Sequence, residues 1–282
     1  MNYVIAVSGG VDSVVLLDMV ANGRLLPDSD HLVVAHFDHG IRPDSADDAE
    51  FVKETAKTYG IPYESRREEL GPHASEELAR ERRYTFLRQV AHEYSGRIVT
   101  AHHADDIAET IAINLHRGTG WRGLAVLDSA GIVRPLLAMR KSEIKNYANQ
   151  HGLKWREDST NSDMKYLRNS MRRKLDGIAD DTVATLCLYR NRQVVLKKQV
   201  SDEARSLIGG GPLYNRHLFI TVPEHVGHEL LRAALLTKTD HGATRPQLER
   251  ALVAIKTLPP GKRYEINGSA TLFFTKTDFL IE

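Results

Sequence analysis

The chain opens with the stretch Asn2–Ser13, NYVIAVSGGVDS, which decides the fold. Its apolar residues Val4, Ile5 and Val7 predict a short buried strand. Ser8–Ser13 then form a turn of small residues, and the apolar run that follows has helical spacing. A strand, a glycine turn and a helix N-terminus make an anion site, because the first amides of a helix lack intrahelical partners and the helix dipole favours negative charge. A phosphate group is therefore the expected ligand.

The sequence of this turn is neither the G-x-x-x-x-G-K-[ST] of the Walker loop nor the G-x-G-x-x-G of the dinucleotide fingerprint. Gly9 and Gly10 allow the backbone to approach a ligand closely, since glycine has no side chain in the way. A plain strand-to-helix turn would need one glycine and one capping residue, Ser8 or Asp12. The full S-G-G-x-D-S sequence therefore favours a ligand-binding turn.

Composition limits the classes of protein to which the chain can belong. Its 282 residues are 41% hydrophobic, which suffices for one large domain or for a large and a small one. The net charge is +1, so any nucleic-acid-binding surface must come from local clusters. The single cysteine, Cys187, excludes an internal disulfide and a cysteine-rich zinc site. We expect a soluble, cytoplasmic protein without membrane contact, because no signal-peptide pattern and no bilayer-spanning apolar run is found.

Strand-like and helix-like segments alternate after the first turn. Strands are predicted at residues 32–37 and 97–101, and amphipathic helices at residues 44–59 and 75–95. This alternation predicts an α/β fold, a Rossmann-like parallel sheet flanked by helices with right-handed crossovers. Ligands of such sheets bind at the carboxyl ends of the strands, so functional residues should follow the strands directly.

The second predicted strand leads into AHFDHGIRPDS, residues 35–45. His36, Asp38 and His39 could form a metal trio; alternatively, Asp38 and His39 fix a loop beside a nucleotide. Zinc is disfavoured, because no further cluster has the spacing of a structural zinc site.

The later strand leads into TAHHADDIAETIAINLHRGTG, residues 100–120, in which histidines and acids open a predicted helix. Helical spacing places His102, Asp106 and Glu109 on one face. Acids in a first turn often only complement the helix dipole, but that does not explain the pair His102 and His103. Carboxylates held together in a cleft suit a cation or a proton transfer, so a positively charged amine is an expected substrate.

Two further stretches are rich in arginine. The first is EELARERRYTFLRQVA, where Arg80 and Tyr84, four residues apart, either point together at a phosphate or belong to a solvated face of ion pairs. The second is WREDSTNSDMKYLRNSMRRKL, residues 155–175, which mixes aromatic and basic side chains as RNA-binding surfaces do. Its alternative is a loop followed by a basic amphipathic helix at the domain edge, which composition alone slightly favours.

The second part of the chain has a different pattern. A long polar helix is predicted at residues 180–208, and a GGGP sequence breaks the chain after it. Two helices, at residues 224–237 and 245–255, and three short strands follow. We therefore predict a catalytic domain at 1–178, a helical linker at 179–208 and a small α+β domain at 212–282.

These motifs resemble those of the bacterial tRNA(Ile)-lysidine synthetases, a family within the PP-loop N-type ATP pyrophosphatases. The matching pieces between Ser8 and Asn169 are SGGVDS, AHFDHGIR, ARERRYTFL, TAHHADDIAETIAINLHRGTG, RPLLAMRKSEIKNYA and WREDSTNSDMKYLRN. The turn alone indicates only the superfamily, whereas the fourth and sixth pieces together are much more specific. TRPQLERAL and LPPGKRYEI resemble pieces of the family's small tRNA-contacting domain.

The resemblance implies a ligase that makes lysidine in two steps. ATP adenylates the C2 oxygen of the wobble cytidine of a tRNA(Ile) with a CAU anticodon, and pyrophosphate leaves. The side-chain amine of free L-lysine then attacks C2 and expels AMP, so that the anticodon reads AUA. ATP and magnesium are the implied cofactors, and whether the protein forms a homodimer is left open.

The resemblance also implies roles for individual residues, and those that would hold ATP are Ser8, Gly9, Gly10, Val11, Asp12 and Ser13. Those with catalytic roles are Asp38, Arg80, His102, His103, Asp106 and Glu109. Those that would contact tRNA are Arg168, Asn169, Arg172, Arg173 and Lys174. Asp12 would bind magnesium and Arg80 would stabilise the α-phosphate. Asp106 and Glu109 would bind the lysine amine.

Three other readings of these motifs are open. A tRNA thiolase of the same superfamily needs cysteines to carry sulfur or a cluster, and Cys187 alone, in a predicted helix, is a poor candidate. An amidating synthetase that uses ammonia or glutamine would lack the basic and aromatic surface. A non-catalytic nucleotide- or RNA-binding protein would not need Asp12, Asp106 and Glu109.

Overall fold

The computed structural model describes residues 1–40, 45–71, 74–157, 167–239 and 242–282, and of residues 167–169 the backbone alone. The chain divides into two compact units, Met1–Gln193 and Val194–Glu282, and the division falls within one long helix, α7 (Asp180–Ile208). The helix predicted at 180–208 is thereby confirmed, whereas the limits of the functional domains stay a prediction. In the described parts of the chain, every helix is too short or too polar to cross a bilayer.

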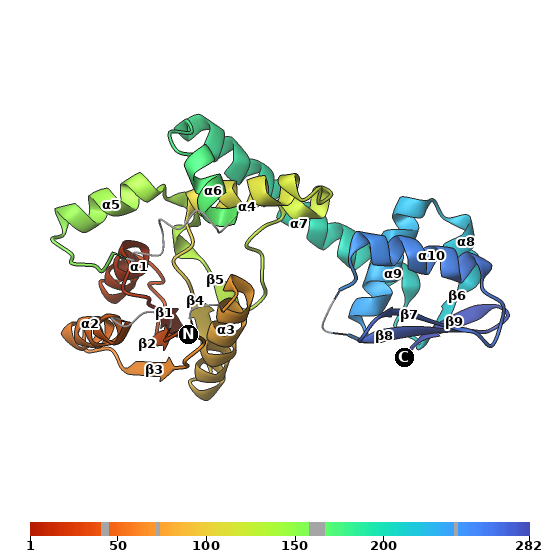
Figure 1. Cartoon of the computed structure of the whole chain (residues 1–282), viewed down its shortest axis with the longest axis horizontal. Coiled ribbons are helices and arrows are strands. Elements are labelled where there is room, and N and C mark those ends of the chain that lie inside the picture. Colours follow the sequence, from red (N-terminus) through yellow and green to blue (C-terminus); the bar gives the residue numbers. More distant parts are fainter. Residues whose placement is uncertain (41–44, 72–73, 158–166, 240–241) are drawn as a thin grey trace. The chain divides into compact units, whose positions relative to one another are not determined.

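The first unit contains a five-stranded parallel sheet with the strand order β3-β2-β1-β4-β5 (Figure 1). Its strands are β1 (Asn2–Ala6), β2 (His31–Asp38), β3 (Tyr63–Arg67), β4 (Arg97–Val99) and β5 (Ile132–Val133). Its helices are α1 (Val11–Ala21), α2 (Ser45–Thr58), α3 (Glu76–Glu93), α4 (Ala104–His116), α5 (Lys141–Gln150), α6 (Leu167–Lys174) and the first part of α7, with 3₁₀ turns at Trp121–Leu124 and Pro135–Ala138. The predicted α/β fold is confirmed.

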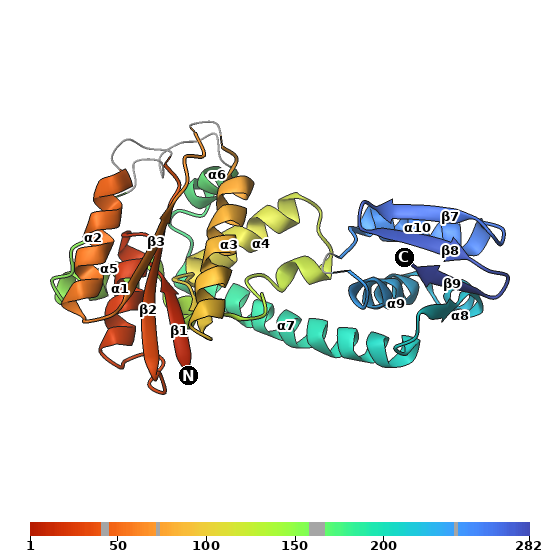
Figure 2. The same cartoon turned by 90° about the horizontal axis from the view of Figure 1, so that it is seen from below.

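Both faces of the sheet are covered, because successive strand residues point to opposite sides. Tyr3, Ile5 and Val7 pack into a core with α1, α2 and α5, whereas Val4 packs with β2 and α3 on the other face. Figure 2 shows the strands β1 to β3 between α2 on one side and α3 on the other. Strands buried on both faces read as continuous apolar runs, which is why β1 and β2 could be predicted.

The position of β1 explains where the site lies. β1 pairs with β2 on one side and with β4 on the other, so the order of the strands reverses at β1. Open α/β sheets bind ligands at such a reversal, beyond the carboxyl ends of the strands. The SGGVDS turn follows β1 at this point.

The second unit is a small α+β structure. Its antiparallel sheet has the order β6-β9-β8-β7. The elements are β6 (Leu213–Asn215), α8 (Arg216–Thr221), α9 (Glu224–Leu236), α10 (Arg245–Thr257), β7 (Arg263–Asn267), β8 (Ala270–Phe274) and β9 (Asp278–Ile281). The helices pack on one face of the sheet around Phe219, Phe274 and Phe279 (Figure 1). The three strands and two helices predicted here are confirmed, and β6 and α8 are additions.

Candidate active site

The SGGVDS turn has the backbone geometry that its two glycines allow. Gly9 has a φ of +91°, in the left-handed region that residues with side chains rarely adopt. A Cβ there would also lie 3.5 Å from the side chain of Val52. Gly10 is extended and forms the N-cap of α1 without a capping side chain. The first amides of α1 are therefore placed to bind an anion.

Ser8 and Ser13 are hydrogen-bonded across the turn. Ser13 Oγ donates to the carbonyl oxygen of Gly10 (2.9 Å) and accepts from the N–H of Ser8 (3.2 Å). Because the single proton of that hydroxyl is in use, Ser8 Oγ is the donor in the 3.2 Å contact between the two hydroxyls. The two side chains are thus oriented before any ligand binds.

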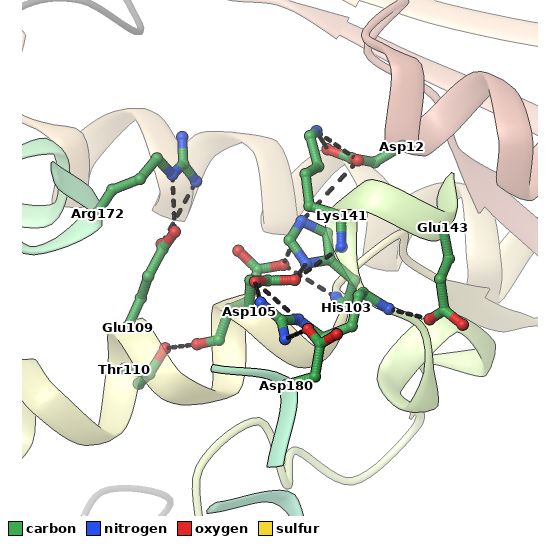
Figure 3. A network of polar contacts seen from close by, with 11 residues as sticks. Asp12, His103, Asp105, Glu109, Thr110, Lys141, Glu143, Arg172 and Asp180 are labelled. Carbon is green, nitrogen blue, oxygen red and sulfur yellow. Dashed lines mark hydrogen bonds and ion pairs between the residues drawn. The ribbon is translucent and has the colours of Figure 1, made fainter. Parts of the chain in front are cut away.

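Asp12 of the turn binds the ammonium group of Lys141. Lys141 Nζ lies 2.5 and 2.6 Å from the two carboxylate oxygens of Asp12, as Figure 3 shows. Sequence reasoning missed this residue, although it lies in the RPLLAMRKSEIKNYA piece. A usable signal was its place as the first residue of α5, where the helix dipole disfavours a cation unless a carboxylate faces it.

His103 lies among three carboxylates at the start of α4 (Figure 3). Its Nδ1 is 3.5 Å from Asp105, and its Nε2 is 3.6 Å from Asp106 and 3.9 Å from Asp12. Burial alone would lower the pKa of His103, but the contact with Asp105 and the charges of Asp106 and Asp12 outweigh it and raise the pKa. His103 therefore keeps a proton beside the turn more readily than a free histidine does.

Asp105 joins α4 to the start of α5. Its carboxylate accepts hydrogen bonds from Arg140 Nε (3.1 Å) and from the N–H of Lys141 (2.7 Å). Burial opposes the charged form, but the contacts with His103, Arg140 and Lys141 outweigh it and hold the pKa of Asp105 well below its usual range. This ionised anchor fixes the backbone of Lys141 where its side chain reaches Asp12.

The predicted helical face of His102, Asp106 and Glu109 is wrong for His102. The helix α4 begins at Ala104, so His102 precedes it and helical spacing does not apply. The Nδ1 of His102 instead lies 2.8 Å from the hydroxyl of Thr100, just after β4. His102 therefore lies in the loop between β4 and α4. The end of β4, and not helical spacing within α4, places it beside the SGGVDS turn.

Asp106 and Glu109 lie one turn apart on α4 and are both buried. Asp106 accepts a hydrogen bond from the N–H of His103 (3.0 Å). The carboxylate oxygens of Glu109 lie 2.7 and 3.3 Å from Nε and Nη2 of Arg172 (Figure 3). Glu109, one of the two acids predicted to bind an amine, therefore already binds a cation of the protein itself, Arg172.

Two histidines at the end of β2 are kept neutral; His36 is buried, and His39, just after the strand, is half-buried. His36 Nδ1 donates to the carbonyl oxygen of Val7 (2.9 Å), and burial lowers the pKa of His36. Burial and the nearby charge of Arg83 lower the pKa of His39 to about 4. Because both imidazoles are neutral, their role at this edge of the sheet is hydrogen bonding.

Asp38, between them in the sequence, has its charge used within the loop. Its carboxylate accepts from the N–H of Gly40 and from Arg67 Nη1, each at 2.9 Å. These bonds favour the alternative in which Asp38 fixes the loop over the one in which it binds a metal. A catalytic role for Asp38 stays a prediction.

A cavity of about 440 Å³ brings these segments together. It is lined by Ser8, Gly10, Asp12 and Ser13 of the turn, by His36 to His39 after β2, and by His102 and Asp106 beyond β4. Its volume is within the range of sites for small molecules. The phosphate-binding turn and one of the acids of α4 thus face the same space.

The helix α3 contributes Arg83, a residue that was not predicted to belong to the site. Arg80 lies over the ring of Tyr84, with Cζ 4.7 Å from the ring centre, as their spacing allows. Arg83, Tyr84 and Leu87 of the same helix line the cavity. Arg83 could have been found from its place three residues after Arg80, one helical turn along. The contact of Arg80 with an α-phosphate stays a prediction.

The helix α6 carries the basic residues predicted to contact tRNA. Arg172, Arg173 and Lys174 are exposed. Arg168 and Asn169 belong to the same helix, but their side chains lie outside the described residues. Contact of this helix with RNA stays a prediction.

The comparison with protein families agrees with this arrangement. A family model described as a PP-loop domain matches residues 1–177. The chain belongs to the PP-loop family. The match includes every segment that lines the cavity, so the SGGVDS turn is the PP-loop of this chain.

Curated relatives of this PP-loop protein bear the name tRNA(Ile)-lysidine synthase, which confirms the predicted resemblance. The one from Geobacter sulfurreducens is 34% identical over 274 residues, which are 90% of this chain and 55% of that protein. The one from Thermus thermophilus is 44% identical over 178 residues, which are 60% of this chain and 34% of that protein. The chain thus spans about half or less of the length of these relatives.

A solved structure shares the PP-loop fold. The U34-tRNA thiolase NcsA from Methanococcus maripaludis, described with its [4Fe-4S] cluster, matches with a TM-score of 0.58 over 69% of this chain and 72% of that chain. The two are 18% identical, so the likeness concerns the fold alone.

Proposed function

We propose that this chain carries the active site of a tRNA(Ile)-lysidine synthase. It would join free L-lysine to C2 of the wobble cytidine of a tRNA(Ile) with a CAU anticodon and convert ATP to AMP and pyrophosphate. The observation that carries the proposal is the single cavity that the PP-loop shares with Asp106 of α4. The names of the curated relatives support the same substrates.

In the first step, the PP-loop would hold the phosphates that leave. The cytidine C2 oxygen attacks the α-phosphorus, the bond to the β-phosphate breaks, and the pyrophosphate stays at the amides of Gly9, Gly10 and Val11. In the substrate-free protein the Ser8 hydroxyl donates to Ser13 Oγ and the Ser13 hydroxyl donates to the Gly10 carbonyl oxygen, so both would rotate to donate to the phosphates. Positioning and charge stabilisation account for most of the catalysis in such a transfer. Lys141, which pairs with the cavity-lining Asp12, adds a positive charge.

Asp12 fits a magnesium ion bound together with ATP. Its carboxylate already binds a cation, Lys141, and Mg²⁺ is usually held by one or two carboxylates together with substrate phosphates. No group of three or more candidate ligands lies together among the residues that the structure describes, so the phosphate oxygens would complete the coordination. When bound, the ion neutralises charge on the phosphates.

In the second step, the amine of lysine must lose a proton before it attacks C2. Asp106 and Glu109 would bind the ammonium form, and a carboxylate in contact with it can take the proton. The adenylated oxygen then leaves as AMP. The raised pKa of His103 makes it a proton-holding neighbour of Asp106 rather than the first acceptor.

A tRNA thiolase is the alternative to weigh, since one shares the fold. The chain has one cysteine, so cysteines of this chain cannot hold a cluster as four do. Burial raises the pKa of Cys187, which disfavours the reactive thiolate. The chemistry of the side chains therefore supports the amine over sulfur.

The test is incubation with ATP, magnesium, labelled lysine and a CAU-anticodon tRNA(Ile) transcript, followed by nucleoside analysis. We expect ATP-dependent label in the anticodon base, lost in Asp12→Asn and kept in Asp28→Asn, an exposed aspartate away from the site. AMP and pyrophosphate formed only with another amine or a sulfur donor would refute the substrate and retain the PP-loop chemistry.

A further inference from the structure

We propose that Arg172 occupies the amine site of the substrate-free protein and changes partner when an amino acid binds. The guanidinium would leave Glu109 for the carboxylate of the incoming ligand, while the ligand's ammonium group takes its place on Glu109. The site would then select ligands that carry both charges. This inference rests on the proposed function, in which Glu109 binds the lysine amine.

The first argument is the burial of Glu109. Only 4% of its side chain is exposed, and Arg172 holds both of its oxygens, with Nε at 2.7 Å and Nη2 at 3.3 Å. A buried carboxylate needs a cationic partner at all times, because an unpaired charge in the interior is strongly disfavoured. An amine that binds Glu109 therefore competes with Arg172 for these two oxygens.

The second argument is the different exposure of the two partners. The side chain of Arg172 is 47% exposed, so it can leave the pair without being stranded in the interior. Burial lowers the pKa of Arg172, but Glu109, Asp106 and Asp12 outweigh it and raise the pKa. Arg172 pairs with Glu109, which lies one helical turn along α4 from the cavity-lining Asp106.

The third argument is the chemistry of the exchange. Once released, the planar fork of Arg172 matches a carboxylate, which it can bind through two parallel hydrogen bonds. A free amino acid with a side-chain amine supplies the ammonium for Glu109 and the carboxylate for Arg172, so every charge keeps a partner. A ligand that has only amines displaces Arg172 but provides no carboxylate for its guanidinium.

The experiment compares L-lysine with cadaverine, which is lysine without its carboxylate. Calorimetry on the full chain would measure both affinities for the wild type, Arg172→Leu, Arg172→Lys and the control Arg192→Leu, an exposed arginine of α7. We expect wild type to prefer lysine, and Arg172→Leu to reduce that preference by about tenfold, roughly the value of one ion pair. Cadaverine should bind Arg172→Leu at least as tightly as wild type, because its competitor is gone.

Arg172→Lys tests the idea if the leucine variant does not fold. It keeps the charge on Glu109 but lacks the fork, so the preference for lysine should fall to an intermediate value with cadaverine binding unchanged. An equal loss for both ligands in these variants, or the same loss in Arg192→Leu, would overturn the exchange and leave the proposed function intact. No binding of lysine to the wild type would overturn both.

Discussion

Two histidines of the site have pKa values shifted in opposite directions, although burial acts to lower the pKa of both. His103 is surrounded by carboxylates and its pKa is raised, whereas His39 has burial and Arg83 against its charge and a pKa of about 4. The same side chain is thus a proton holder in one place and a neutral group in the other. Which of the two it becomes depends on the charges that the fold brings to it.

The first prediction concerns the titration of these two residues. We expect His39 to stay neutral down to about pH 4 and His103 to keep its proton above the ordinary histidine pKa of about 6.5. Below about pH 6.5, His39 binds a proton in the unfolded chain but not in the folded one. The contribution of His39 to the stability of the folded state is therefore lost as the pH falls. The contribution of His103 to stability has the opposite pH dependence. It is lost as the pH rises through the raised pKa of His103.

Nitrogen NMR of the imidazoles across this pH range would measure both histidines in one sample. A His103 that titrates below the ordinary histidine pKa of about 6.5 would contradict the assignment of its charged neighbours.

The second prediction uses the two glycines of the PP-loop as a matched pair. Gly9→Ala should lower the free energy of unfolding by about 1–2 kcal/mol, because alanine is strained at a φ of +91°. Gly10→Ala should cost less, since Gly10 is extended and a Cβ there meets only Ser8 Oγ at 3.7 Å. Urea unfolding of both variants checks this, and equal losses would argue against the left-handed turn.

Among the elements, α1 is fixed behind the PP-loop by a buried carboxylate. Asp18 on α1 accepts hydrogen bonds from the hydroxyls of Tyr59 (2.7 Å) and Tyr147 (2.6 Å) and from Asn22 Nδ2 (3.1 Å). Tyr59 follows α2 and Tyr147 belongs to α5. Burial and the charge of Asp18 raise the pKa of both tyrosines, that of Tyr147 to about 12, so both act as neutral donors.

The third prediction is that Asp18 needs both tyrosines. Tyr59→Phe and Tyr147→Phe should each cost about 1–2 kcal/mol of unfolding free energy, since hydrogen bonds to a charged group are the stronger ones. The double variant should cost more than the sum, because it leaves the buried carboxylate to Asn22. Chemical denaturation would measure this, with Tyr189→Phe as control, because that side chain on α7 is 52% exposed. If the losses of unfolding free energy in the two single variants simply add up in the double variant, solvent replaces the hydroxyl donors that Asp18 has lost.

At the scale of the whole molecule, the two units have separate hydrophobic cores. Leu16 is fully buried under the sheet of the first unit, and Leu272 is fully buried in the core of the second. The cavity with the PP-loop belongs to the first unit. Loss of packing in one core should therefore act differently on nucleotide binding than loss in the other.

The fourth prediction compares Leu16→Ala with Leu272→Ala. Each should cost about 2–5 kcal/mol in the unit that carries it, through the lost contacts and the cavity left behind. Leu272→Ala should leave ATP affinity unchanged, whereas Leu16→Ala should weaken it, because Leu16 packs α1 and α1 carries the PP-loop amides. Calorimetric unfolding with and without ATP would show both effects. An ATP affinity lowered equally by both variants would contradict independent cores.

The edges of the sheet show where sequence reasoning failed. The central strands β1 and β2 are apolar and could be predicted, but β3 reads YESRR with a half-exposed pattern, and β5 has two residues. Both lie at the edges, where burial does not impose an apolar sequence, so pairing with a neighbour decides the conformation. The same limit explains β6 of the second sheet.

The sequence by itself determined the phosphate-binding turn, the alternation of strands and helices and the presence of acids at the start of α4, because these depend on neighbours within a few residues. Only the tertiary structure decided that Lys141 binds Asp12, 129 residues away, and that Arg172 binds Glu109, 63 residues away. It also decided that Arg83 rather than Arg80 lines the cavity. Such pairs depend on the strand order and helix packing that bring distant segments together, and a carboxylate buried in this way takes whichever cation the fold places beside it.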